Sequence, residues 1–242
     1  MLDFLGIGAQ KAGTTWLYDR LARHESVSFP AGKEVHFWDA NRSRGLEWYC
    51  SLFAGDEPGK RRGEITPAYA ILPPEVIAEI YRLNPRLRIF YLIRNPIDRA
   101  WSSALMALDR AEMKIGEASD QWFIDHFRSA GSLLRGDYEQ CLRNWHREFP
   151  REQILVLRHE MIREAAVPLL SACCRHLGID PDFPARVPTP GLLEPVFPGP
   201  GHPLRPSLLP VLRALYLPKI ESLSAYMDID LSDWLKSGGL SR

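Results

Sequence analysis

The chain has 242 residues, of which 45% are hydrophobic and 25% are charged, and its formal net charge is zero. This composition is ordinary for a soluble globular protein, and the lack of a basic excess disfavours nucleic acid as a partner. No apolar run is long enough to span a membrane, and the four cysteines form no Cys-x-x-Cys pair, so we expect reduced thiols and no zinc site. A cytoplasmic protein with a single domain over residues 1–242 is the simplest prediction.

Apolar strands alternate with helical periodicity along the chain, beginning with a strand over 3–8 and a helix over 14–24. A near-continuous apolar run at 87–93 is typical of a parallel strand that is covered on both faces. This alternation predicts an α/β fold, a P-loop-like three-layer α/β/α domain with a central parallel sheet. The other expected elements are strands at 27–29, 63–67 and 154–157, helices at 44–53, 73–83, 96–108, 121–129, 138–149, 167–177, 207–226 and 231–235, a loop at 113–119, and an irregular proline-rich stretch at 181–206.

The loop between the first strand and the first helix is the most informative segment. Gly8 and Gly13 have the G-x-x-x-x-G spacing of a phosphate-binding loop, but Thr14 stands where such loops usually carry lysine. The lysine lies inside the loop, at Lys11, and Thr14 and Thr15 add hydroxyl donors. A strand end followed by a helix start favours anions, because unpaired N–H groups and the positive end of the helix dipole meet there. The loop therefore predicts a phosphate or sulfate site.

A second anion site is predicted where the 87–93 strand ends. Arg94 follows that strand at the edge where ligands bind in open α/β sheets. In a nucleotide triphosphatase an acidic residue at such a position completes a magnesium site, whereas an arginine repels metal and attracts an anion. Arg94 and Ser102 are suited to clamp one phosphate, the first with its guanidinium and the second with its hydroxyl. The pattern suits a nucleotide with two separated anionic groups and no metal.

These two segments together resemble the motifs of the sulfotransferases that use 3′-phosphoadenosine 5′-phosphosulfate (PAPS). Their donor loop reads K-x-G-T-T and their 3′-phosphate motif reads R-x-P-x-x-R-x-x-S. Segments 33–38, 64–69 and 136–150 also resemble the heparan sulfate branch of that family, so the likeness covers most of residues 3–160. We expect a bacterial-type member. The residues that match the two motifs are Lys11, Gly13, Thr14 and Thr15, and Arg94, Pro96, Arg99 and Ser102.

The resemblance implies how the donor is held. Arg94 and Ser102 would bind its 3′-phosphate, the product would be 3′-phosphoadenosine 5′-phosphate (PAP), and no metal would take part. Lys11 would act on the bridging oxygen, where negative charge grows as the phosphate leaves. The residues implied in binding the 5′-phosphosulfate are Lys11, Ala12, Gly13, Thr14, Thr15 and Trp16.

The resemblance also implies that Glu34 is the base that deprotonates the acceptor, a hydroxyl or amine of a glycan, a glycolipid or a small molecule. Its aromatic neighbourhood is expected to raise the pKa of the carboxyl group. His36 is the competing base, because imidazole titrates near neutrality, and the alternatives are that it orients Glu34, contacts the acceptor or is a structural histidine. Lys33 is either a ligand for acceptor or sulfuryl oxygens or a solvated side chain.

Two other functions remain as alternatives. A P-loop kinase for a small molecule would require Mg-ATP, and both Thr14 and Arg94 count against it. A non-catalytic nucleotide-binding module is disfavoured because Lys11 and Glu34 are both present. The proline-rich stretch at 181–206 stands where the heparan sulfate branch has a disulfide-bearing loop over the adenosine. Candidates for covering the adenosine here are Arg135, Gly136, His202 and Arg205.

Overall fold

The computed structural model describes residues 2–55, 58–187, 189–194, 196 and 201–236. Contacts within the chain define two compact units. The sheet unit consists of Met1–Ile93 and Asn144–Phe197, and the helical unit consists of Arg94–Arg143 and Pro198–Arg242. The single domain expected over residues 1–242 stays a prediction.

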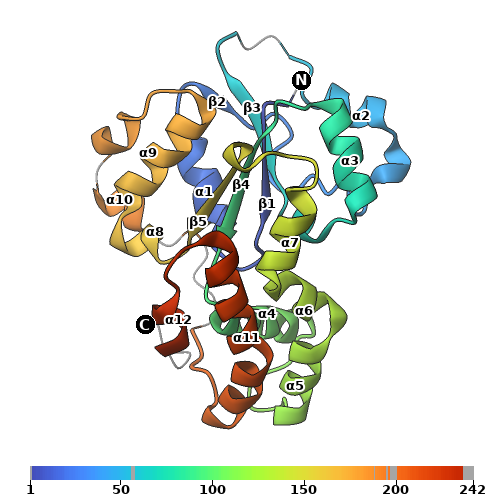
Figure 1. Ribbon diagram of the computed structural model, residues 1–242, viewed down its shortest axis with the longest axis vertical. Coiled ribbons are helices and arrows are strands. Elements are labelled where there is room, and N and C mark those ends of the chain that lie inside the picture. Colours follow the sequence, from blue (N-terminus) through green and yellow to red (C-terminus); the bar gives the residue numbers. More distant parts are fainter. Residues whose placement is uncertain (1, 56–57, 188, 195, 197–200, 237–242) are drawn as a thin grey trace. The chain divides into compact units, whose positions relative to one another are not determined.

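Five parallel strands in the order β2-β3-β1-β4-β5 form the centre of the sheet unit (Figure 1). The two central strands β1 and β4 are buried along almost their whole length, as their continuous apolar sequences predict. In the pairing register Leu5 lies between Glu64 of β3 and Ile89 of β4. The strands are β1 Phe4–Gly8, β2 Val27–Ser28, β3 Arg61–Ile65, β4 Arg88–Ile93 and β5 Ile154–Arg158.

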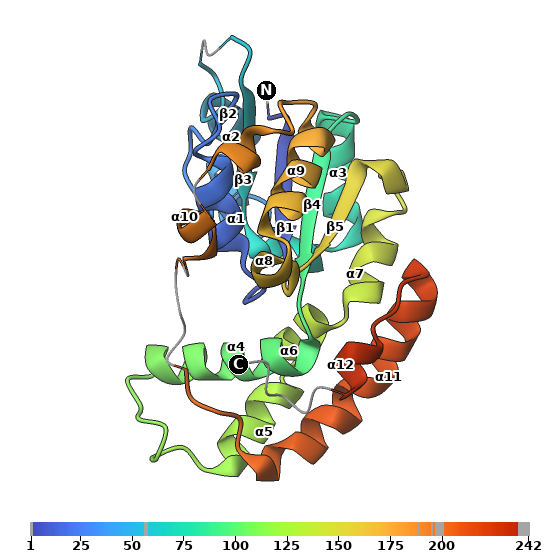
Figure 2. The ribbon, with the colours of Figure 1, turned by 90° about the vertical axis from the view of Figure 1, so that its left-hand side faces the viewer.

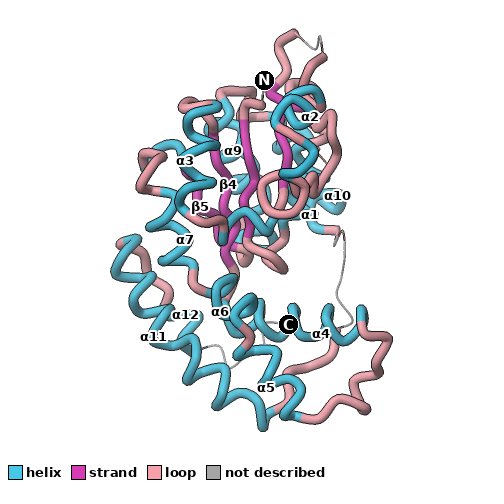
Figure 3. The backbone as a smooth tube through the Cα atoms, turned by 90° about the vertical axis from the view of Figure 1, so that its right-hand side faces the viewer, coloured by secondary structure: helices cyan, strands magenta, loops and turns pink. Residues whose placement is uncertain are grey.

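Helices cover both faces of this sheet and so produce three layers. Helices α1 and α9 lie over one face (Figure 2), and α2 and α3 lie over the other (Figure 3). The short helices α8 and α10 pack against α9. The parallel sheet between two helical layers confirms the predicted P-loop-like fold. The bounds of these helices are α1 Thr14–Leu21, α2 Leu46–Ser51, α3 Pro74–Leu83, α8 Met161–Glu164, α9 Ala166–Leu177 and α10 Thr189–Leu193.

Local signals at the helix ends agree with the structure. Pro74 opens α3, where the missing N–H of proline costs no hydrogen bond. Gly178 ends α9 with a φ of 66°, in the left-handed region that glycine adopts without a steric penalty. The stretch at 181–206 differs from its prediction, because a 3₁₀ turn at Phe183–Arg186 and helix α10 interrupt it. Residues 188, 195 and 197–200 of that stretch lie outside the described residues.

The helical unit gathers segments from the middle and the end of the chain. Its helix α6 and the sheet unit's α8 were not predicted, because both are short and carry little apolar periodicity. None of the helices within the described ranges has both the length and the apolar character needed to cross a membrane. The helices of this unit are α4 Pro96–Arg110, α5 Asp120–Arg128, α6 Ala130–Gly136, α11 Leu209–Met227 and α12 Ser232–Lys236, and α7 Tyr138–Trp145 begins in it.

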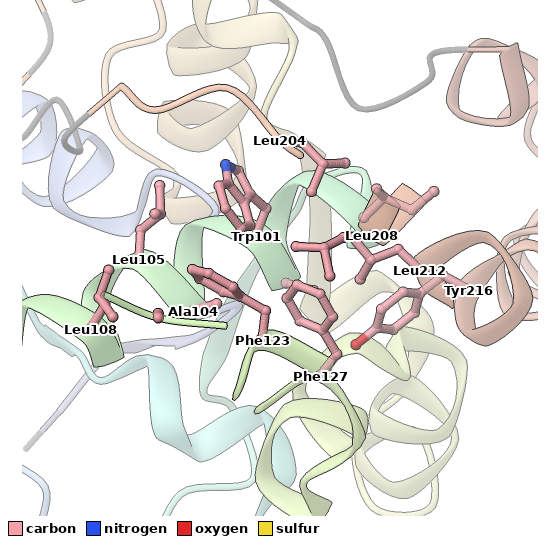
Figure 4. Packing of buried hydrophobic residues seen from close by; sticks show 13 residues of the cluster. Trp101, Ala104, Leu105, Leu108, Phe123, Phe127, Leu204, Leu208, Leu212 and Tyr216 are labelled. Carbon is pink, nitrogen blue, oxygen red and sulfur yellow. The ribbon is translucent and has the colours of Figure 1, made fainter. Parts of the chain in front are cut away.

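A buried apolar cluster holds the helical unit together (Figure 4). Phe123 of α5 is fully buried, with its ring centroid 5.0 Å from that of Trp101 in α4 and 6.5 Å from that of Phe127. The guanidinium carbon of Arg205 lies 4.8 Å from the same ring. Leu208 and Leu212 of the C-terminal segment complete the cluster, so burial of apolar surface joins the two parts of the chain that form this unit.

Replacement of Phe123 tests this core. We expect Phe123→Ala to lower the free energy of unfolding by about 3–5 kcal/mol, because it removes a buried ring and leaves a cavity. Urea denaturation followed by tryptophan fluorescence measures the change. Leu134→Ala is the matched control, because Leu134 is 49% exposed in α6 and its loss should change the free energy little. Equal effects of the two substitutions would contradict this assignment of the core.

Candidate active site

The anion loop, residues 9–13, joins β1 to α1 and begins beside the end of β4. The N–H of Ala9 donates to the carbonyl of Leu92 at 2.5 Å, and the N–H of Ala12 donates to the carbonyl of Ala9 at 3.1 Å. The N–H of Leu17 donates to the carbonyl of Gly13 at 3.1 Å as the first turn of α1 closes. The N–H groups of residues 14–16 precede that bond, at the positive end of the helix dipole. The loop therefore has the backbone of an anion site.

Gly13 is required at its position by both conformation and space. It precedes α1 with a φ of 93°, in the left-handed region. A Cβ atom there would lie 2.6 Å from Cδ1 of Ile162 and 3.0 Å from Nδ1 of His159. The second glycine of the predicted motif thus lets the loop pack closely against the segment that follows β5.

His159 supports the loop from the neighbouring strand end, and sequence reasoning missed it. Its backbone N–H donates to the carbonyl of Ile93 at 2.8 Å, and its ring Nδ1 lies 3.1 Å from the carbonyl oxygen of Ala12. A carbonyl only accepts hydrogen bonds, so Nδ1 carries the proton in this contact. The signal in the sequence was a histidine directly after the 154–157 strand, at the edge where ligands bind.

The predicted donor-loop residues fall into two groups. Lys11 and Thr15 are half-buried, and Thr14 is buried at the start of α1. The indole of Trp16 points away from the loop, because its Nε1 donates to the carbonyl of Leu192 at 2.7 Å in the interior. Trp16 can therefore offer an anion only its backbone N–H, whereas the N–H of the buried Ala12 is already bonded to the carbonyl of Ala9.

A second group of polar residues lies in residues 33–39, which contain Glu34, the base that the resemblance implies. Lys33 and Glu34 form an ion pair. The ring Nε2 of His36 lies 3.7 Å from Oε2 of Glu34, and its Nδ1 lies 2.9 Å from Oδ2 of Asp39. This Glu34–His36–Asp39 series places one imidazole between two carboxylates. Asp39 was missed in the sequence, although its spacing of three from His36 was the available signal.

The candidate catalytic residues share an unusual backbone conformation. Lys11, Glu34 and His36 have φ values of 67°, 63° and 54°, in the left-handed region that residues other than glycine seldom adopt. Each such residue costs on the order of 1–3 kcal/mol and persists only where its surroundings hold it. The N–H of Glu34 is held by the carbonyl of Ile65 at 3.0 Å, at the end of β3.

The electrostatic environment corrects one expectation about Glu34. Burial by itself raises the pKa of the carboxyl group, but the hydrogen bond and charge of Lys33, together with His36, outweigh burial and lower the pKa below its usual value. The predicted rise in this pKa was wrong, because Lys33 and His36 lower the pKa by more than burial raises it. Glu34 is therefore an ionised carboxylate at neutral pH and is ready to accept a proton.

Arg94 and Ser102 belong to the helical unit. The carbonyl of Arg94 accepts a hydrogen bond from the Tyr138 hydroxyl at 2.8 Å, and Ser102 is half-buried in α4. Between them, the Asn95 side chain caps α4 by accepting the N–H of Ile97 at 3.0 Å. The structure thus places Arg94 just before α4 and Ser102 on it, as the sequence predicted.

Arg99, the second arginine of the predicted motif, packs inside the helical unit and connects its helices. Its side chain is fully buried, and its Nη2 lies 3.0 Å from the carbonyl oxygen of Ser132 and 3.4 Å from the hydroxyl oxygen of Tyr216. Arg99 therefore connects α4 to α6 and α11. It is buried, whereas Ser102, three residues later in the same helix, is only half-buried.

The candidates for covering adenosine also have structural contacts inside the helical unit. Arg205 donates to Oδ1 of Asp120 at 2.7 Å and to the carbonyl oxygen of Ala118 at 2.9 Å. The carbonyl of His202 accepts the indole N–H of Trp101 at 2.8 Å. The guanidinium of Arg205 is thus already occupied by the packing of α5.

Comparison with known proteins agrees with this geometry. Residues 2–188 match the family model described as a sulfotransferase domain. The chain belongs to the sulfotransferase domain family. It is 28% identical to heparan sulfate glucosamine 3-O-sulfotransferase 5 of Homo sapiens over 184 residues. This alignment covers 72% of the chain and 53% of the human protein. The chain is 30% identical over 159 residues to heparan sulfate glucosamine 3-O-sulfotransferase 6 of Mus musculus, which covers 64% of this chain and 46% of the relative. The chain thus spans about half the length of these curated relatives.

Solved structures give the same family and fold. A sulfotransferase from Alicyclobacillus acidocaldarius superposes with a TM-score of 0.78 at 26% identity, covering 98% of this chain and 99% of the other. Mouse sulfotransferase SULT7A1 complexed with PAP has a TM-score of 0.60 at 17% identity, covering 94% of this chain and 88% of that one, and supports the fold. This chain therefore has a counterpart of similar fold and length in the Alicyclobacillus acidocaldarius structure.

The ion pair between Lys33 and Glu34 gives a direct test. We expect Lys33→Met to raise the pKa of Glu34, because the substitution removes the positive charge that favours the carboxylate. Carbon-13 NMR titration of the Glu34 carboxyl group measures this pKa without any assay of activity. Lys114→Met, which removes an exposed lysine of the helical unit, should leave it unchanged. A pKa that is unchanged in Lys33→Met would show that the pair does not control the charge of Glu34.

Proposed function

We propose that this sulfotransferase moves a sulfuryl group from PAPS to a hydroxyl or amine of a glycan, a glycolipid or a small molecule. The observation that carries the proposal is the loop after β1, which combines Lys11, the tight Gly13 turn and the start of α1 without the usual Gly-Lys-Ser/Thr ending. Membership of the sulfotransferase family and the ionised Glu34 support it. The relatives named for glucosamine sulfation support a carbohydrate among these acceptors.

On the donor side, each residue would bind a negatively charged group of the nucleotide. The N–H groups of residues 14–16 and the hydroxyls of Thr14 and Thr15 would hold the 5′-phosphosulfate. Lys11 would stabilise the negative charge that develops on the bridging oxygen as the S–O bond to the phosphate breaks. Arg94 and Ser102 would bind the 3′-phosphate. The guanidinium of Arg94 would make a bidentate contact, and the hydroxyl of Ser102 would donate a hydrogen bond beside it.

On the acceptor side, Glu34 is the base that the geometry favours. Its carboxylate would take the proton from the acceptor hydroxyl or amine as the acceptor oxygen or nitrogen bonds to sulfur. His36 lies beside Glu34 and has Asp39 on its other nitrogen, so its ring is held for orienting Glu34 or the acceptor. The roles of Lys33 are to keep Glu34 ionised and to hold the carboxylate in place.

The donor assignment predicts a split between two nucleotides that differ by one phosphate. We expect Arg94→Ala to weaken PAP binding about 10- to 150-fold, the loss of a charged hydrogen bond, while the affinity for adenosine 5′-phosphate stays unchanged. Lys11→Ala should weaken the binding of both nucleotides, because both carry the 5′-phosphate. Isothermal titration calorimetry measures these affinities, with Arg128→Ala as an exposed-arginine control.

The same calorimeter separates a sulfotransferase from the kinase alternative. The proposal requires PAP to bind more tightly than Mg-ATP. Tighter binding of Mg-ATP, or an Arg94→Ala variant that loses no PAP affinity, would refute the donor assignment.

The base assignment predicts a loss in the chemical step. We expect Glu34→Gln to lower kcat by about 10²–10⁴-fold and to keep PAP affinity, because the amide cannot accept the acceptor proton. In the wild type kcat/KM should fall as the pH is lowered through the depressed pKa of Glu34, and this acid limb should vanish in the variant. Transfer from radiolabelled PAPS to a library of acceptors gives the rates. An effect confined to the KM of the acceptor would make Glu34 a binding residue, and a loss of the acid limb only in His36→Asn would make His36 the base.

A further inference from the structure

Glu64, on the last part of β3, is a buried carboxylate to which the proposed mechanism gives no role. Its side chain is fully buried, and it is ringed by donors. Tyr49 donates to its Oε1 at 2.6 Å, and the Thr66 hydroxyl donates to its Oε2 at 2.8 Å. The hydroxyl of Tyr69 lies 3.3 Å from Oε1. A carboxylate out of contact with water needs such donors, since each unsatisfied oxygen would be costly.

Two hydrogen-bond paths lead from Glu64 to the backbone between Glu34 and Phe37. The N–H of Val35, the residue between Glu34 and His36, donates to the Glu64 carboxylate. The hydroxyl oxygen of Tyr69 accepts the N–H of Phe37 at 2.8 Å. The carboxylate therefore holds one N–H of this segment directly and a second through a tyrosine.

The direction of the Tyr69 hydrogen bonds depends on the carboxylate. An N–H can only donate, so the Tyr69 oxygen uses its lone pairs on Phe37 and, at 3.4 Å, on Trp38. Its proton then points to the acceptor on the other side, which is Glu64. Burial and the nearby charge of Glu64 raise the pKa of Tyr69, so the hydroxyl keeps this proton at every physiological pH.

We propose that Glu64 is the positioning residue for Glu34 and His36, holding their left-handed backbone through the N–H of Val35 and through Tyr69. This inference rests on the proposed function, since it gives Glu64 a purpose in placing the base. The φ values of Glu34 and His36 require an outside restraint, and the Glu64 contacts fall on the residues between and after them. Glu64 touches no reacting group in this assignment and acts only through the segment that it holds.

Two tyrosines supply a matched pair of variants. Tyr49 and Tyr69 are both buried, and each loses one hydroxyl as phenylalanine. Tyr69→Phe deprives the N–H of Phe37 of its acceptor. Tyr49→Phe removes a hydrogen bond to the same Glu64 oxygen but leaves the Val35 and Phe37 contacts in place, and the ring stacked 4.5 Å from that of Phe37 is kept.

We expect Tyr69→Phe to lower kcat about 10- to 100-fold, with the KM for PAPS and the affinity for PAP unchanged. Tyr49→Phe should keep kcat within about twofold. Carbon-13 NMR of Glu34 adds a readout without catalysis: its pKa should rise toward the ordinary value in Tyr69→Phe, where the pairing with Lys33 and His36 is loosened, and stay in place in Tyr49→Phe. Thermal melting checks that both variants fold. Glu64→Gln tests the role of Glu64 directly. If that variant does not fold, the comparison of Tyr69→Phe with Tyr49→Phe still tests this role.

The two proposals fail in different ways. Wild-type protein that binds no PAP and transfers no sulfuryl group would end the proposed function, while the NMR comparison would still test the positioning. Wild-type kcat and an unshifted Glu34 pKa in Tyr69→Phe would overturn the role of Glu64. Equal losses in the two tyrosine variants would also overturn it, because they would show that Glu64 only stabilises the fold.

Discussion

The parallel pairing of β1 with its two neighbours is the constraint on which the candidate site depends. Parallel strands bring all their carboxyl ends to one edge, so the segments that follow them start side by side. The anion loop follows β1 and is bonded to Leu92 at the end of β4. Residues at the ends of β3 and β5 hold the Glu34 segment and the Ala12 carbonyl. Burial of the apolar strands therefore supplies the rigid edge from which the polar chemistry is arranged.

That edge allows unfavourable conformations to persist in the loops. Lys11, Glu34 and His36 each have a left-handed backbone without being glycine. A loop held only by its own residues would relax to a more favourable conformation, since the cost is comparable to one or two hydrogen bonds. Here hydrogen bonds from the end of β3 and from the turn after it supply that free energy, through Ile65 to Glu34 and through Tyr69 to Phe37. Stability of the sheet and geometry of the site are linked through these contacts.

Sequence reasoning predicted the features that repeat or that follow directly along the chain. The apolar runs of β1 and β4, the glycines of the anion loop and the Gly178 cap all carry local signals, and the structure contains each of them. It could not predict contacts between distant segments. Trp16 looked like part of the anion loop until its indole was found bonded to Leu192, 176 residues away. His159 was missed for the same reason, because its role arises only when separate segments meet.

The error over Glu34 shows why charge must be judged from neighbours in space. Burial by itself raises the pKa of both Glu34 and Glu64, yet the two pKa values move in opposite directions. Burial dominates at Glu64 and raises its pKa despite the hydrogen bonds from Tyr49, Thr66 and Tyr69, whereas at half-exposed Glu34 the ammonium of Lys33 reverses the effect of burial. Two carboxylates whose environments push their pKa values apart are suited to different tasks. The accessible, ionised one is fit to exchange a proton with a substrate, and the buried one is fit to hold the backbone that presents it.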